Sequence, residues 1–158
     1  CKHCTSGSRS IRIFDKGLRM KVRFFSATDH EGLEDQQDAM LALWTRCPAC
    51  GDFEPQDLFG MVRDGRAVIG AVYEGDRPVL AGAFEFVHYP RQLAVNVMAI
   101  AGEQMDAAMD AFWETFRQWC RQAGAEVIEA RCAPGMARLL ARKGFEPAYT
   151  VVRQKLEV

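Results

Sequence analysis

Residues 99–116 read AIAGEQMDAAMDAFWETF, and this stretch decides the fold. It opens with an apolar run, breaks at Gly102 and then places apolar side chains at helical spacing. A strand that ends in a glycine turn and leads directly into a helix is also a common way to bind phosphate, because the first N–H groups of a helix lack intrahelical partners. The stretch therefore predicts a strand–helix corner and leaves open whether that corner holds a phosphate group.

The elements on both sides of this corner follow from hydrophobic spacing. The helix is predicted to run from Met105 to Ala123, where Gly124 ends it. The strand before it, at 93–102, is almost entirely apolar, which is typical of a strand buried on both faces. Further strands are predicted at 21–25, 67–75, 79–90, 126–132 and 149–158. Further helices are predicted at 31–47, 55–65 and 134–144.

The order of these elements predicts the fold class. Three consecutive strands joined by short turns indicate an antiparallel meander, whereas the strand–helix–strand unit that follows brings its second strand parallel to the first. We therefore expect an α/β fold with a mixed, mostly antiparallel central sheet and flanking helices.

The composition indicates a globular protein without a strongly charged surface. The chain has 158 residues, of which 49% are hydrophobic and 26% charged, and its net charge is -1. This length suits one domain, and the weak charge argues against nucleic-acid and anionic-membrane partners. No apolar run approaches the roughly 20 residues of a membrane span, and no signal peptide is recognised. We expect a cytoplasmic protein.

The N-terminal residues differ in character from the rest. The chain begins at Cys1, residues 1–19 are polar, and Met20 is followed by KVRFFSATD, which reads as a first strand. We expect residues 1–19 to be a disordered leader or a non-native extension, and residues 20–158 to be the domain.

Four of the six cysteines form two CxxC pairs, a common arrangement for zinc: Cys1, Cys4, Cys47 and Cys50. The pairs are much farther apart than the roughly 12–20 residues of compact zinc sites. We therefore expect reduced cysteines and no metal, with a zinc-stabilised variant through Cys47 and Cys50 as a minor alternative. The other two cysteines, Cys120 and Cys132, lie in apolar contexts and are expected to be small core residues.

The segment RCAPGMARLLARKGFEPAYTVVRQKL at 131–156 resembles the GCN5-related N-acetyltransferase family. Members of that family typically end in a strand, a short helix that closes with Gly-Phe, here Gly144-Phe145, and a last strand with a basic residue near its end. The resemblance extends over 20–158 and implies a fold of the acyl-CoA N-acyltransferase type. More narrowly, the chain resembles acetyltransferase-like proteins encoded by tailed phages, which would place it in the host cytoplasm or in the virion.

The resemblance implies acetyl-CoA as cofactor. In that family the fourth strand diverges from the fifth, the coenzyme A arm lies in the gap, and the pyrophosphate rests on N–H groups at the start of the next helix. Mapped onto this chain, the implied cofactor-binding residues are Met98, Ala99, Ile100, Gly102, Glu103, Gln104, Met105, Asp106 and Ala107. A backbone N–H between Met98 and Ile100 would polarise the thioester carbonyl.

This chain departs from the family pattern at three places. Ala107 replaces the first glycine of the phosphate loop, and Glu103 and Asp106 would repel a pyrophosphate, although acidic residues also suit an ordinary helix N-terminus. Leu140 stands where many members carry the tyrosine that protonates the leaving thiolate. Two functions therefore stay open: an N-acetyltransferase-like protein with a degenerate coenzyme A loop, or a non-catalytic phage structural or accessory protein that keeps the fold.

Two residues are candidate catalytic groups. The attacking amine must lose a proton, and Glu85 can accept it because it interrupts an apolar strand. Since Phe84 and Phe86 point to the opposite face, Glu85 lies either on a solvated face or in the substrate cleft. Tyr149 is the candidate acid in place of Leu140. The acceptor would be a small-molecule or protein amine, and a phage protein would also contact other virion proteins.

Overall fold

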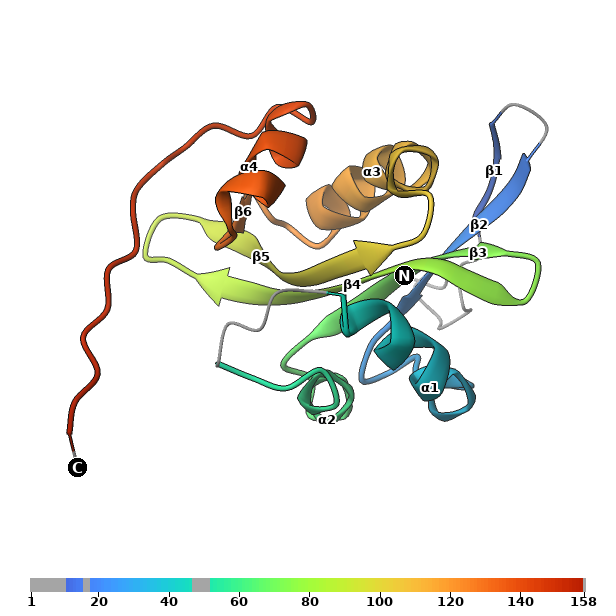
Figure 1. Cartoon of the computed structure of the whole chain (residues 1–158), viewed down its shortest axis with the longest axis horizontal. Helices are drawn as coiled ribbons and strands as arrows, with labels where there is room; N and C mark the ends of the chain where they lie inside the picture. Colours follow the sequence, from blue (N-terminus) through green and yellow to red (C-terminus); the bar gives the residue numbers. More distant parts are fainter. Residues whose placement is uncertain (1–10, 16–17, 47–51, 158) are drawn as a thin grey trace.

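The computed structural model describes residues 11–15, 18–46 and 52–157 (Figure 1). Within these residues, strands in consecutive order form one sheet, β1-β2-β3-β4-β5-β6. The strands are β1 (Ile11–Asp15), β2 (Leu18–Phe25), β3 (Val68–Glu74), β4 (Arg77–His88), β5 (Leu93–Gly102) and β6 (Val127–Ala130). The helices are α1 (Leu33–Trp44), α2 (Asp57–Arg63), α3 (Met105–Gln122) and α4 (Pro134–Ala141).

The sheet is mixed. Neighbouring strands pair antiparallel from β1 to β5, and β5 and β6, which α3 connects, pair parallel. The predicted α/β fold with a mostly antiparallel sheet is confirmed. The predicted strands of the meander and the long helix agree with β3, β4, β5 and α3 to within a few residues, because their hydrophobic periods are uninterrupted.

Two helical layers enclose the sheet, as Figure 1 shows. On one side, the α3/α4 face, α3 packs its apolar residues on Val22, Val72, Phe84, Val95 and Val97. On the other, the α1/α2 face, the buried residues are Ile69, Ala71, Ala81, Ala83, Ala99 and Ala101 beneath α1 and α2. Small alanines line this second face, so the helices approach the strands closely.

The sheet begins earlier than the sequence suggests. Residues 11–15 form β1, which pairs antiparallel with β2, and β2 itself starts at Leu18. Residues 11–15 and 18–19 thus belong to strands, and residues 1–10 lie outside the described residues. The division into a leader or non-native extension at 1–19 and a domain at 20–158 stays a prediction. The alternation in IRIFD signals a strand, but its polar surroundings masked that signal.

The predicted last strand at 149–158 is wrong. Residues 146–157, called the tail below, run extended after α4 without pairing with any strand of the described chain. The alternation in YTVVRQKL favours an extended backbone, but a strand also needs a partner edge, and local sequence does not specify one.

Cysteine placement differs from the expectation at one position. Cys120 is buried in α3 as predicted, but Cys132 is exposed between β6 and α4, so its assignment to the core is wrong. The cysteines of both CxxC pairs lie outside the described residues. Within the described residues, no three metal-binding side chains gather, and no helix is both long and apolar enough to span a membrane.

Candidate functional site

The corner between β5 and α3 is shaped by packing against β4. A Cβ placed on Gly102 would lie 2.5 Å from the Val79 carbonyl oxygen and 3.0 Å from Leu80 Cα. The next residue, Glu103, donates its backbone N–H to that same Val79 oxygen at 2.8 Å. Glycine is therefore required here by the close approach of two backbones, independently of any ligand.

We expect Gly102→Ala to lower the free energy of unfolding by about 1–3 kcal/mol, because the new methyl group must displace backbone atoms of β4. Urea denaturation measures this change. Gly60→Ala is the matched control: Gly60 lies in α2 with no atom within 4 Å of an added Cβ. That variant should gain about 0.5–1 kcal/mol through helix propensity. Equal effects of the two substitutions would contradict the packing explanation.

Helix α3 begins without a side-chain cap. Gln104 is its N-cap residue, adopts the left-handed conformation with φ 50° and makes no capping hydrogen bond. Among the described residues it is the one non-glycine with positive φ. The first helical bond is donated by the Ala108 N–H to the Gln104 oxygen, so the N–H groups of Met105–Ala107 point out of the helix end. These N–H groups form an electropositive end suited to an anion.

Of the two acidic residues at this corner, Asp106 is exposed in the first turn of α3, and Glu103 is paired with two arginines. Arg77 Nη1 lies 2.7 Å from Glu103 Oε2, and Arg46 Nη2 lies 3.8 Å from Glu103 Oε1. All three side chains are exposed, so the pairs are weak and can exchange partners. The repulsion expected from Glu103 is therefore offset, and the two guanidinium groups stand beside the start of α3.

Strand β5 is irregular at the point where β6 leaves it. The register of β4 with β5 shifts between Ala83, which pairs with Ala99, and Phe84, which pairs with Val97, so Met98 is an extra, bulged residue. The pairing of β5 with β6 ends at the same level, at Val97 with Ala130. The second half of β5 thus continues to the corner without β6 beside it.

Polar side chains from three strands meet on the α1/α2 face. Glu85 of β4 is opposite Asn96 of β5, which is opposite Glu129 of β6. Their sequence neighbours belong to the α3/α4 core, so all three project toward the α1/α2 side. Asn96 Nδ2 donates to Glu85 Oε1 at 2.8 Å. We call these three residues the polar row.

The polar row lies close to the bulge. Met98 is two residues beyond Asn96 on β5, a spacing of about 7 Å along a strand. Asn96 Oδ1 is buried and has no hydrogen-bond partner among the described residues. A buried amide oxygen of this kind is an acceptor for an N–H donor that the described chain does not supply.

Tyr89 closes one end of the polar row. Its hydroxyl donates to Glu129 Oε1 at 2.6 Å. This bond, with partial burial and the nearby Tyr149, raises the pKa of Tyr89 above its usual range. The phenol therefore stays protonated and holds the Glu129 carboxylate in place.

The residues expected to donate a proton lie elsewhere. Leu140 is buried in α4 with 3% of its surface exposed, so it serves the core. Tyr149 lies in the tail, is 65% exposed and contacts Tyr89. Nothing in the described chain places its hydroxyl beside Met98, and its role as an acid stays a prediction.

Solved structures share this architecture. One is aminoglycoside N-acetyltransferase AAC(6')-Iy, solved in complex with CoA. It is 15% identical, the alignment covers 92% of this chain and 100% of that protein, and the TM-score is 0.65. Another is glucosamine-6-phosphate N-acetyltransferase from Arabidopsis thaliana. It is 12% identical, the alignment covers 87% of this chain and 99% of that protein, and the TM-score is 0.63. The chain has the GCN5-related N-acetyltransferase fold.

Ribosomal-protein-alanine N-acetyltransferase from Brucella melitensis biovar Abortus 2308 also has this fold. It is 10% identical, the alignment covers 87% of this chain and 99% of that protein, and the TM-score is 0.64. No protein-family model and no curated protein sequence matches the chain. At these identities the likeness establishes the fold and confirms the acyl-CoA N-acyltransferase type expected from 131–156.

Within this fold, the structure brings some predicted residues together and adds others. Glu85 and Met98 share the α1/α2 side, and Gly102–Ala107 form the corner. The residues that sequence reasoning missed are Arg46, Arg77, Tyr89, Asn96 and Glu129. Asn96 and Glu129 each stand as a polar residue between apolar neighbours, the same signal that identified Glu85.

Proposed function

We propose that this chain transfers an acyl group from acyl-coenzyme A, most simply acetyl-CoA, to an amine. The observation that carries the proposal is the divergence of β5 from β6 at the Met98 bulge, directly beside the polar row. The bulge offers backbone groups to one reactant, and the polar row offers carboxylates to the other, within about 7 Å.

The corner between β5 and α3 is proposed to hold the diphosphate of the coenzyme. The N–H groups of Met105–Ala107 can donate to phosphate oxygens, and the dipole of α3 favours negative charge there. Arg46 and Arg77 can exchange Glu103 for phosphate, because their ion pairs are exposed and weak. Ala107 stands in place of the family's glycine, and the two arginines would add attraction for phosphate at this loop.

Glu85 is the proposed general base. An amine is mostly an ammonium ion at neutral pH and must lose a proton before it can attack a carbonyl. Glu85 is held by Asn96 Nδ2, and the buried Asn96 Oδ1 is free to accept a second N–H of the acceptor. A backbone N–H at the Met98 bulge is proposed to polarise the carbonyl oxygen.

Acetyl-CoA, when bound, supplies the acetyl thioester. Since Leu140 lies in the core and Tyr149 in the exposed tail, solvent is proposed to protonate the leaving thiolate. Glu129 and Glu85 give the acceptor side a negative charge, which favours amines that carry additional positive charge. Similar structures include an aminoglycoside and a glucosamine-6-phosphate acetyltransferase, so an amine acceptor agrees with them.

A second candidate function is a non-catalytic assembly module, such as a phage structural or accessory protein with a degenerate coenzyme A loop. The buried Leu140 and the tightly packed Gly102 favour it. At both positions packing in the protein accounts for the residue, and no bound coenzyme is needed to explain it. The two candidates differ in whether the corner binds a diphosphate.

Calorimetric titration of acetyl-CoA tests the proposal. We expect saturable binding that weakens as salt is raised. Arg77→Ala should raise the Kd about fivefold, the most that an exposed charge pair contributes. Arg63→Ala is the matched control, since Arg63 is also exposed and paired with a glutamate, Glu34 at 3.6 Å, but lies in α2. No heat at millimolar ligand from folded protein would favour the assembly module.

A further inference from the structure

The tail is held against the body of the protein by side chains rather than by burial. Val152 and Leu156 are 87% and 81% exposed, and residues 146–157 pair with no strand of the described chain. Exposed apolar side chains gain little from this position. The course of the tail must therefore be set by its polar contacts.

The strongest of these contacts joins residues far apart in sequence. Arg153 binds Asp52 in a two-pronged ion pair, with Nη1 2.5 Å from Oδ1 and Nη2 2.6 Å from Oδ2. The hydrogen bond from Arg153 lowers the pKa of Asp52, and the charge of Arg131 acts in the same direction. The Asp52 carboxylate is therefore ionised and available to Arg153 at neutral pH.

A second contact fixes the tail to the sheet. Tyr149 interacts with Tyr89, whose hydroxyl is bonded to Glu129 of the polar row. The stretch from Tyr149 to Arg153 spans at most about 14 Å when extended. This short stretch joins the contact with the sheet to the contact with the segment before α2.

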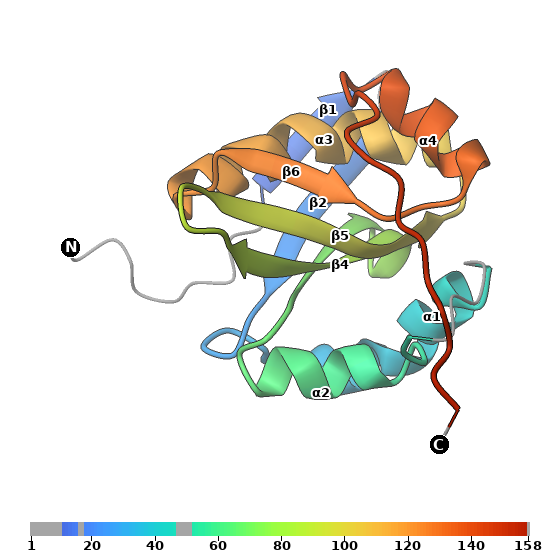
Figure 2. The same ribbon diagram turned by 90° about the vertical axis from the view of Figure 1, so that its left-hand side faces the viewer.

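The tail runs down one side of the molecule between these two anchors. In Figure 2 it crosses in front of the ends of β5 and β6 on its way from α4 to the level of α2, and in Figure 1 it runs outside the turn between β4 and β5. The polar row faces the same side as α1 and α2, and Glu129 lies at its β6 end, under Tyr89. Tyr149 of the tail therefore stands at the β6 end of the row, where Tyr89 is bonded to Glu129.

We propose that the tail is a strap over the acceptor side of the polar row, latched by the Arg153–Asp52 ion pair, and that its release controls access to Glu85 and Glu129. This inference rests on the proposed function, because only an acceptor-binding site makes access to Glu85 and Glu129 relevant. The order of the tail and the exposure of the two carboxylates can nevertheless be measured without turnover. Since both latch side chains are about half exposed, the closed state is favoured by no more than about fivefold. The strap thus opens readily and reversibly.

Charge reversal tests the latch. Asp52→Arg and Arg153→Asp each remove the ion pair, and the double variant restores it with opposite polarity. In the wild type, NMR order parameters of Thr150–Val152 should exceed about 0.6, should fall below it in each single variant, and should recover in the double variant. Recovery will be partial because Arg131 repels an arginine at position 52.

Carboxylate labelling measures access on the same four proteins. With a carbodiimide and glycine ethyl ester, read by peptide mass spectrometry, Glu85 and Glu129 should label about three- to fivefold faster in the single variants and return toward wild type in the double. Glu114, exposed on α3, is the internal control and should not change.

The outcomes separate the two proposals. Order parameters below 0.6 in the wild type would overturn the strap. Equal labelling rates of Glu85 and Glu129 in the wild type and the single variants would also overturn it. Labelling that follows the latch, in proteins that neither bind nor consume acetyl-CoA, would support the strap and refute the proposed function.

Discussion

Glu85→Gln should reduce kcat/KM for acyl transfer about 10²- to 10⁴-fold while leaving the Kd for acetyl-CoA unchanged. Glutamine has the shape of glutamate and keeps the oxygen that accepts from Asn96 Nδ2, so the strand pairing is preserved. What it loses is the ability to take a proton from the ammonium group, and general-base catalysis contributes a factor of this size. Steady-state kinetics at saturating acetyl-CoA measures the loss.

A matched variant in the polar row gives the diagnostic comparison for Glu85. Glu129→Gln is the matched control, because Glu129 lies in the same row but is held by Tyr89 at its far end. It should lower affinity for cationic amines and spare kcat. A larger loss of kcat in Glu129→Gln than in Glu85→Gln would move the base to Glu129.

The fold could be predicted where hydrophobic periods are long. The apolar run of β5 and the helical spacing of α3 specify the strand–helix corner, and the meander follows from alternation and turns. The tail shows the limit of this reasoning. Its residues alternate as a strand should, but pairing depends on an available edge and on distant contacts such as Arg153 with Asp52.

The candidate site could be predicted only in part for the same reason. Glu85 stands out locally, because a carboxylate between two phenylalanines needs an explanation. Its partner Asn96 and the alignment with Glu129 depend on strand register, which a one-residue bulge at Met98 resets. The neutralisation of Glu103 depends on Arg46, in the turn after α1, and on Arg77 of β4, which meet only in the folded chain.

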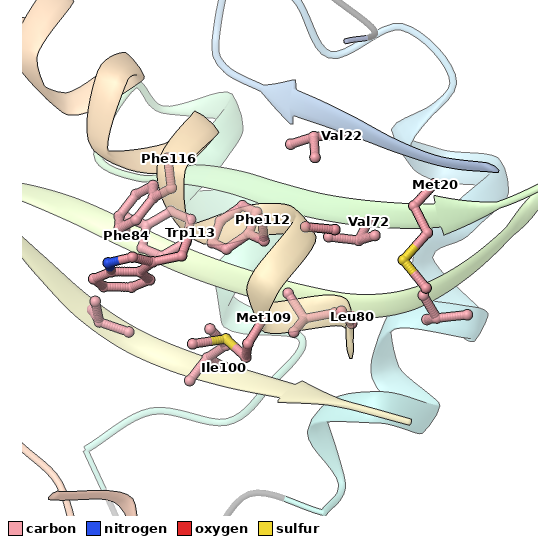
Figure 3. Close-up of a cluster of buried hydrophobic side chains, with 14 of the residues drawn as sticks. Met20, Val22, Val72, Leu80, Phe84, Ile100, Met109, Phe112, Trp113 and Phe116 are labelled. Carbon is pink, nitrogen blue, oxygen red and sulfur yellow. The ribbon is translucent and has the colours of Figure 1, made fainter. Parts of the chain in front are cut away.

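Phe112→Ala should lower the free energy of unfolding by about 3–5 kcal/mol, the usual cost of truncating a buried aromatic ring. Phe112 has no exposed surface and lies in a column of rings, with centroids 5.9 Å from Phe84 and 5.1 Å from Phe116 (Figure 3). Gly70 leaves the space that its ring fills, since an added Cβ would come within 3.0 Å of it. Urea denaturation followed by circular dichroism measures the change.

The matched control for Phe112 is Phe86, which packs at the margin of the same core against Trp119 with ring centroids 5.8 Å apart. Phe86→Ala should cost less than half as much, because a partly buried ring leaves a smaller cavity. Equal losses of stability would show that Phe112 contributes no more than Phe86 to the packing of α3 on the sheet.

Phe84, the ring beneath Phe112, precedes Glu85 on β4 and points to the opposite face. Because the column and the polar row are two faces of one strand, Phe112→Ala should reduce activity only in proportion to the unfolded fraction, and a larger loss would mean that the column also positions Glu85.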